Sequence, residues 1–212
     1  MKLTPVLLIN FVTLIFSITI HEASHALIAD LCGDPTAKEL GRVTLNPIPH
    51  IDLLGTIIIP LGIMIFNPQV SLIGWGKPCP VNPFNYKHAE RDDILVSIAG
   101  PGSNFIAVIL CVIIFKIFIM TGVHLQGAFA LLNSLIGINI ILFVFNLIPI
   151  PPLDGSHIIR YFMSEPIKEG FDKLDRWGFF ILILFVNTPL FGQFYRIFAQ
   201  PIHYLIKFIF ML

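Results

Sequence analysis

His21-Glu22-Ala23-Ser24-His25 lies near the end of the first long apolar run of the chain, residues 3–31. At 3.6 residues per turn, helix positions i and i+4 lie about 40° apart, so His21 and His25 face the same way. Two imidazoles placed in this way can hold one zinc ion, and Glu22 is close enough to act as general base for a water on that zinc. The stretch therefore predicts a helix that carries two metal ligands and a base.

The apolar surroundings of this stretch strengthen the interpretation. A carboxylate at the centre of a membrane helix costs about 2.5 to 3.5 kcal/mol on insertion scales, and ionisable residues in such helices mark functional sites. A bound metal ion would compensate the three ionisable groups. The alternative is that this end of the helix lies at the membrane surface, where histidine and glutamate are harmless.

The composition is that of an integral membrane protein. Of the 212 residues, 56% are hydrophobic and 12% are charged, whereas a soluble domain carries about 25% charged residues. The expected partner is the lipid bilayer. Because 13 basic residues balance 13 acidic ones, the charge gives no reason to propose a nucleic-acid partner.

Three apolar runs are long enough to cross a bilayer, which needs about 20 residues of helix. They are residues 3–31, 94–120 and 127–148. The run 53–66 is short for a crossing and fits a re-entrant segment better. Beyond residue 176, two apolar stretches separated by prolines predict one or two additional C-terminal helices.

Two segments between the first and second spanning runs predict extended backbone. Residues 42–49 alternate polar and apolar side chains up to two prolines, which suits a short strand. Residues 67–85 are rich in proline and glycine, and irregular backbone at membrane depth survives only where protein or a watery cavity satisfies it. We therefore expect this stretch against the histidine-bearing helix, where it could pair with an extended substrate. An ordinary surface loop is the alternative.

These elements define the predicted fold class. It is an all-α polytopic membrane protein with a core of three spanning helices, a re-entrant segment with short β-strands, and one or two additional C-terminal helices.

The distribution of charge predicts the orientation. If the first helix runs from outside to inside, the short loop 121–126 lies outside and carries no lysine or arginine, which obeys the positive-inside rule. The chain is then a multi-pass protein of the cell membrane with its histidine pair and Asp154 toward the cytoplasmic side. Residues 53–76 must enter and leave on that same side. The basic residues placed inside are Lys38, Arg42, Lys77, Lys87, Arg91, Arg160, Lys168, Lys173 and Arg176.

A catalytic zinc site has three protein ligands and one open position, so a third ligand must come from elsewhere. Asp154 follows a proline-rich break at the end of an apolar run, and Gly155 allows a sharp turn there. An isolated aspartate at such a place would be interpreted as a helix cap, but at the membrane level of the histidines Asp154 is the best candidate. The rival ligands are His157, Glu165 and Glu169.

Three stretches together resemble the site-2 protease family of intramembrane zinc metalloproteases, the M50 peptidases. HEASH at 21–25 is similar to the zinc motif of this family, and NLIPIPPLDG at 146–155 looks like its Asn and Leu-Asp-Gly signature. GPGSN at 100–104 is similar to its GxxxN motif. The resemblance implies that His21, His25 and Asp154 bind one zinc ion and that Glu22 activates the water.

The same resemblance suggests further roles within the core. It implies that Asn146 contacts the substrate backbone or the oxyanion and that Asn104 supports the core or the site. The stretch around 74–80 looks like the edge strand beside the cleft of this family. No segment is long or polar enough for the PDZ domain that many relatives carry, so a minimal member is expected.

The predicted function is that of a zinc metalloendopeptidase that cuts within or near transmembrane segments of membrane proteins or peptides. Residues 1–212 would form a single membrane-embedded M50 domain, with its catalytic core at about 3–155 and C-terminal helices at 177–212. The alternative is a catalytically silent zinc-binding membrane scaffold. Glu22 favours the enzyme, because a structural zinc site has no use for a base beside the metal.

Overall fold

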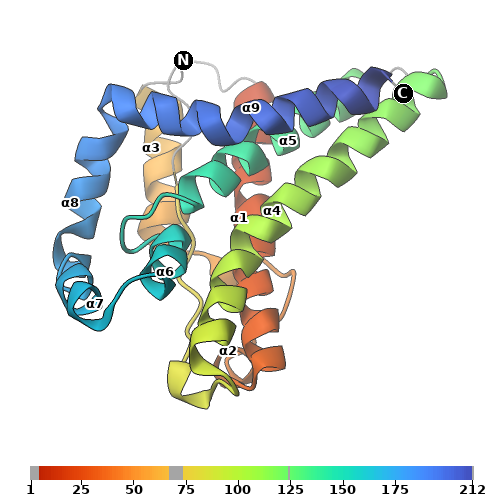
Figure 1. Cartoon of the computed structure of the whole chain (residues 1–212). Coiled ribbons are helices and arrows are strands. Elements are labelled where there is room, and N and C mark those ends of the chain that lie inside the picture. The colour runs from red at the N-terminus through yellow and green to blue at the C-terminus, as the bar shows by residue number, and fades with distance from the viewer. Residues whose placement is uncertain (1–4, 67–73, 124, 212) are drawn as a thin grey trace.

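The computed structural model of the chain describes residues 5–66, 74–123 and 125–211, and every regular element in these ranges is a helix (Figure 1). Three helices are long and apolar enough to cross a membrane: α1 (Pro5–Cys32), α4 (Ala89–Met120) and α5 (Gln126–Asn146). The chain is therefore a nearly all-helical, multi-pass membrane protein, as predicted.

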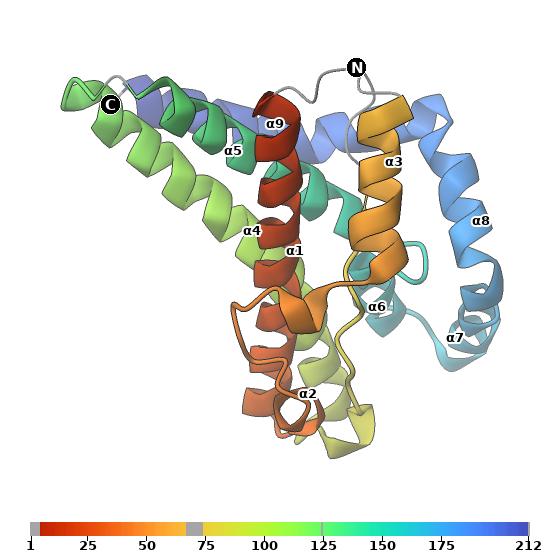
Figure 2. The same cartoon turned by 180° about the vertical axis from the view of Figure 1, so that it is seen from behind.

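The three long helices form the centre of the molecule. α1 packs against both α4 and α5, and α4 packs along α5 (Figures 1 and 2). Several buried positions between them are small or polar, among them Ser17, Ala26, Asn104 and Asn139. Small side chains let membrane helices approach closely and polar ones hydrogen-bond between helices. This composition brings the backbones of α1 and α4 close together where the histidines lie.

The C-terminal part of the chain forms two helices that meet at a sharp bend. The chain bends by 86° between α8 (Asp175–Val186) and α9 (Pro189–Met211), and α9 crosses the end of the molecule where α1 begins (Figure 1). One face of α9, which includes Ala199 and Ile202, packs against Val108 of α4 and Ile140 of α5. Proline is tolerated in the first turn of a helix, and α9 starts at one.

The predicted short strands are wrong, since the described residues contain no strand. In residues 42–49 the amide of Asn46 donates to Thr44 Oγ1 and the amide of Ile48 donates to Asn46 Oδ1. Such local bonds compete with strand pairing, and Pro47 and Pro49 have no amide to offer a partner strand. A 3-10 turn over Ile48–His50 forms instead.

The run predicted to be re-entrant is a short apolar helix. A π-helical start, Leu53–Ile58, continues into α3 (Ile59–Phe66). Residues 67–73, the first part of the proline- and glycine-rich stretch, lie outside the described residues. Residues 74–82, the irregular segment, run without regular structure past α1 and α3 (Figure 2), and a 3-10 turn over Pro83–Asn85 follows them. A Cβ atom at Gly74 would lie 3.2 Å from Leu14 of α1 and 3.0 Å from Pro60 of α3.

The buried side chain of Arg42 fixes the middle of this irregular segment. Its guanidinium donates to the carbonyl groups of Pro49, Lys77 and Pro78. The amide of Lys77 donates to the carbonyl of His50 at 2.8 Å. Arg42 therefore ties residues 77 and 78 to the turn that precedes α3.

Asp34 fixes the end of the segment. This side chain follows α1, is 0% exposed, and accepts hydrogen bonds from the Asn82 amide at 2.6 Å, from Asn85 Nδ2 at 2.9 Å and from Thr36 Oγ1 at 2.5 Å. Burial would raise the pKa of the Asp34 carboxyl, but these hydrogen bonds outweigh burial and lower the pKa. The stability they supply is present above the unfolded pKa of about 3.9 and is lost as the pH falls through the lower folded pKa.

Replacing Asp34 by asparagine should loosen this attachment. The amide keeps one acceptor oxygen and turns its NH2 group toward donors, so we expect the free energy of unfolding at pH 7 to fall by about 1.5 to 3 kcal/mol. Thermal unfolding in detergent measures the change, with the reaction of the buried thiols as the signal that reports unfolding.

Asp30→Asn is the matched control. Asp30 pairs with Lys38, whose side chain is 60% exposed, and pairs of this kind contribute about 0.2 to 1 kcal/mol. Equal destabilisation by the two substitutions would show that Asp34 has no special anchoring role.

Candidate metal centre

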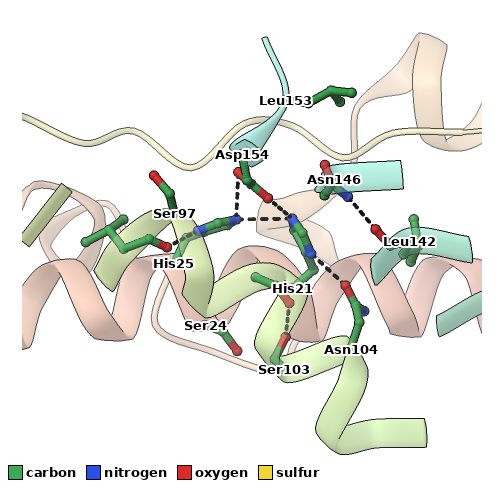
Figure 3. A network of polar contacts seen from close by, with 12 residues as sticks. His21, Ser24, His25, Ser97, Ser103, Asn104, Leu142, Asn146, Leu153 and Asp154 are labelled. Carbon is green, nitrogen blue, oxygen red and sulfur yellow. Dashed lines mark hydrogen bonds and ion pairs between the residues drawn. The ribbon is translucent and has the colours of Figure 1, made fainter. Parts of the chain in front are cut away.

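Three side chains of metal-ligand type converge at one point. His21 and His25 come from α1, and Asp154 comes from the start of α6 (Asp154–Tyr161) (Figure 3). His21 Nε2 lies 3.2 Å from Asp154 Oδ2, His25 Nε2 lies 3.4 Å from Asp154 Oδ1, and the two Nε2 atoms are 3.1 Å apart. The structure thus brings together the three residues that the sequence predicts as ligands.

The proton on the His25 ring is placed by a backbone group. His25 Nδ1 lies 2.7 Å from the carbonyl oxygen of Val96 in α4. A carbonyl can only accept, so Nδ1 must donate and carries the proton. In the neutral ring the lone pair is then on Nε2, which points toward Asp154 and His21.

The proton on His21 is placed in the same way by a side chain. His21 Nδ1 lies 2.7 Å from Asn104 Oδ1, and Asn104 Nδ2 donates to the carbonyl of Ser17 at 3.3 Å. The Ser17 carbonyl sets which end of the amide is the NH2 group, so the oxygen faces His21. His21 Nδ1 is therefore the donor, and Nε2 also presents a lone pair to the centre.

The third candidate ligand is the carboxylate of Asp154. Burial would raise the pKa of the Asp154 carboxyl, but the His25 and His21 imidazoles outweigh burial and hold this pKa well below its usual range. Asp154 Oδ2 is buried and has no hydrogen-bond donor among the described residues.

When both imidazoles are neutral with their protons on Nδ1, two Nε2 lone pairs and the Asp154 carboxylate face one another, and a bound cation would replace the protonated imidazole that otherwise balances the carboxylate. This donor set fits a divalent cation, and two histidines with one carboxylate is a known ligand set of catalytic zinc.

Two glycines allow these groups to approach one another. A Cβ atom on Gly100 of α4 would lie 2.6 Å from His21 Nε2 and closer still to His25 Nε2. A Cβ atom on Gly155 would lie 2.6 Å from the carbonyl oxygen of Ile148. Gly100 therefore leaves the space in front of the imidazoles open, and Gly155 permits the tight turn that brings Asp154 back to them.

Glu22 lies next to His21 on α1 and is half-buried beneath the irregular segment. A Cβ atom added to Gly76 would lie 3.2 Å from Glu22 Cγ and 2.6 Å from Ile18 Cγ2. Gly76 thus leaves room for the Glu22 side chain between α1 and the segment. The predicted base and the predicted substrate-facing segment are direct neighbours.

The two predicted asparagines lie on different helices near the centre. Asn104 of α4 contacts His21, as described above. Asn146, at the end of α5, is half-buried and donates from Nδ2 to the carbonyl of Leu142 at 3.0 Å (Figure 3). The helix itself therefore holds one end of the Asn146 amide.

The rival ligands lie outside the three-residue cluster. His157 Nδ1 faces Asp93 Oδ2 at 3.4 Å, and its side chain is 51% exposed. Glu165 pairs with Lys168 at 2.8 Å on α7 (Glu165–Asp172), where Glu169 is exposed. Among these candidates, Asp154 is the one whose side chain lies beside both histidines.

Two further residues of this region are not singled out by the sequence. Asn139 of α5 and Ser17 of α1 are fully buried and continue the hydrogen bonds that begin at Asn104. A polar side chain in the middle of an otherwise apolar spanning run is the available signal.

Comparison with known proteins finds one family pattern and several relatives. The sequence pattern of Peptidase family M50 matches residues 114–185. YwhC of Bacillus subtilis, named as a candidate zinc metalloprotease, is 37% identical over 195 residues, which cover 90% of this chain and 84% of YwhC. Rip2 of Mycolicibacterium smegmatis, named in the same way, is 26% identical over 85% of this chain and 67% of its own length. The zinc metalloprotease MJ0392 of Methanocaldococcus jannaschii is 25% identical over 77% of this chain and 36% of its own length. No solved structure matches this chain.

A methyl group at residue 100 should close the metal centre. We expect Gly100→Ala to weaken zinc binding at least tenfold, because the new Cβ would occupy the space in front of both imidazoles. Zinc content after equilibration with a competing chelator measures the loss.

Gly102→Ala, two residues away on α4, is the matched control. The nearest atom to a Cβ there is Ile98 Cγ2 at 3.9 Å, so this variant should bind zinc like the wild type. Equal zinc affinity of both variants would contradict the assigned role of Gly100.

Proposed function

Because this chain belongs to peptidase family M50, the site-2 protease family, we propose that it is a zinc metalloprotease that cuts peptide bonds within or near transmembrane segments. Its substrates would be membrane proteins or transmembrane peptides. The observation that carries the proposal is the convergence of His21, His25 and Asp154, with Glu22 beside them on the same helix. The identity to relatives named as zinc metalloproteases supports it.

The chemistry follows from the side chains around the centre. One zinc ion held by His21, His25 and Asp154 would lower the pKa of a bound water to about 7 and polarise the scissile carbonyl. Glu22 accepts the proton of the attacking water and passes it to the nitrogen of the leaving amine. The Nδ1 hydrogen bonds of both histidines hold the rings in place throughout.

The irregular segment offers an open backbone edge for the substrate. The Trp75 amide donates to the carbonyl of Gly55, and the Lys77 amide donates to the carbonyl of His50. Successive residues of an extended chain direct their amides and carbonyls to opposite sides. Gly76 lies between these two residues, and its amide and carbonyl make no hydrogen bond within the described residues. We infer that an unwound substrate segment pairs with Gly76 and is thereby held beside Glu22.

Asn146 is the candidate for a second contact to the substrate. Its Nδ2 bonds to the carbonyl of Leu142, whereas the described residues provide no hydrogen bond to its Oδ1. Oδ1 could accept a hydrogen bond from a substrate amide. Rotation of the side chain would instead direct Nδ2 toward the oxyanion.

The proposed orientation places the metal centre toward the cytoplasm in the cell membrane. Its support is the distribution of charge, because the basic residues assigned to the inside belong to segments such as α2 (Thr36–Glu39), α6 and α7. α2 lies at the end of the molecule opposite to α9, and α6 and α7 lie between the two ends, below α9 in the view of Figure 1. In this orientation residues 53–76 enter and leave the membrane on the cytoplasmic side.

Replacing Glu22 by glutamine tests the enzyme directly. We expect cleavage of a fluorescent transmembrane peptide by the purified protein in detergent to fall by a factor of about 10² to 10⁴, the usual contribution of a general base. Zinc content should be unchanged, because Glu22 is not a proposed ligand.

A protein that binds zinc but cleaves no peptide would support the alternative of a catalytically silent scaffold. If wild type and Glu22→Gln both hold zinc and neither cuts any peptide of a varied panel, the protease proposal is wrong and a binding partner should be sought.

A further inference from the structure

We propose that Asn139 of α5 is a positioning residue for the metal ligand His21 and that it acts through Asn104. The inference deepens the proposed function and rests on the zinc centre of His21, His25 and Asp154. It adds the third long helix, α5, to the parts of the chain that set the geometry of that centre.

A continuous set of hydrogen bonds joins Asn139 to the histidine. His21 Nδ1 donates to Asn104 Oδ1 at 2.7 Å, and Asn104 Nδ2 donates to Asn139 Oδ1 at 2.8 Å. Asn139 Nδ2 donates to Ser17 Oγ at 2.9 Å and to the carbonyl of Leu135 at 2.8 Å. Asn104, Asn139 and Ser17 are all 0% exposed.

The direction of these bonds is set by backbone groups. The Leu135 carbonyl can only accept, so the NH2 group of Asn139 must point to it and the oxygen must point to Asn104. That oxygen and the Ser17 carbonyl both require the NH2 group of Asn104 on their side. The Asn104 oxygen is then the atom that faces His21.

This polarity decides which ring nitrogen of His21 is free for the metal. If the Asn104 amide were reversed, its NH2 group would face Nδ1, and the ring proton would have to move to Nε2. A protonated Nε2 cannot bind a metal ion. The reversed amide would also place Asn104 Oδ1 against the oxygen of Asn139 and the carbonyl of Ser17. Asn139 therefore disfavours the arrangement in which His21 cannot act as a ligand.

The surroundings make this contribution large enough to measure. Asn104, Asn139 and Ser17 are shielded from bulk water, which therefore cannot replace a lost partner, and buried polar networks are costly when partly satisfied. Residues that hydrogen-bond to metal ligands commonly change metal affinity 10- to 100-fold when removed. Asn139 is one step further from the metal, so the lower end of that range is expected.

The test measures zinc affinity of the purified full chain by competition with a chelator. Asn139→Leu keeps the size of the side chain and removes its hydrogen bonds, and should weaken zinc binding about tenfold. Ser134→Ala is the matched control, because Ser134 Oγ donates to Asn10 Oδ1 at 2.7 Å and so also joins α5 to α1 without reaching His21. It should bind zinc like the wild type.

Three further variants separate positioning from a general structural role. Asn139→Asp, which when buried stays protonated, keeps an oxygen for Asn104 and a donor for Leu135, and should restore most of the affinity. On an Asn104→Leu background, Asn139→Leu should cause less than a twofold further loss, because the route through Asn104 by which it is proposed to act on His21 is already broken. His21→Ala must abolish tight binding if the zinc centre is where we propose.

Each outcome has one meaning. Wild-type affinity in Asn139→Leu, or a loss that multiplies with that of Asn104→Leu, would overturn the positioning role while leaving the zinc centre intact. Equal losses in Asn139→Leu and Ser134→Ala would reduce Asn139 to a packing residue. Tight zinc binding by His21→Ala would instead overturn the proposed centre itself. The absorption spectrum of the Co²⁺-substituted protein gives a second readout of the ligand set.

Discussion

The candidate metal centre depends on the hydrogen bonds that Nδ1 of His21 and Nδ1 of His25 donate. A histidine can bind a metal through Nε2 only if Nδ1 keeps the proton. In the apolar middle of a bundle that proton needs a protein acceptor, and α4 supplies two: the Val96 carbonyl for His25 and the Asn104 amide oxygen for His21. The close packing of α1 on α4 would therefore be a requirement of the proposed metal chemistry as well as of the fold.

The other features of the core follow from this contact. Gly100 leaves open the space that the imidazoles face, and Gly155 allows Asp154 to return to them from the end of α5. The irregular segment reaches α1 at Gly76, where the absence of a side chain makes room for Glu22. Arg42 and Asp34 hold that segment by hydrogen bonds from outside the spanning helices. The candidate ligands, the base and the substrate-facing edge thus come from three separate parts of the chain: α1, the start of α6 and the segment around Gly76.

Much of the centre could be predicted from the sequence because its first elements are local. The spacing of His21 and His25 defines one face of any helix, and the prolines before Asp154 mark a break whatever the tertiary structure. Strands were predicted wrongly at residues 42–49, because alternation does not reveal that Thr44 and Asn46 bond to neighbouring amides. Asn139 could not be assigned, since its partner Asn104 is 35 positions away and no local pattern sets how α4 and α5 face each other.

Zinc K-edge X-ray absorption on the purified protein tests the central claim most directly. A centre of His21, His25 and Asp154 predicts a first shell of nitrogen and oxygen at about 2.0 to 2.2 Å, with the outer-shell scattering of two imidazoles and no sulfur. A sulfur shell at about 2.3 Å, which would bring in a thiol such as the half-buried Cys79, would contradict it. A first shell without imidazole would contradict it equally.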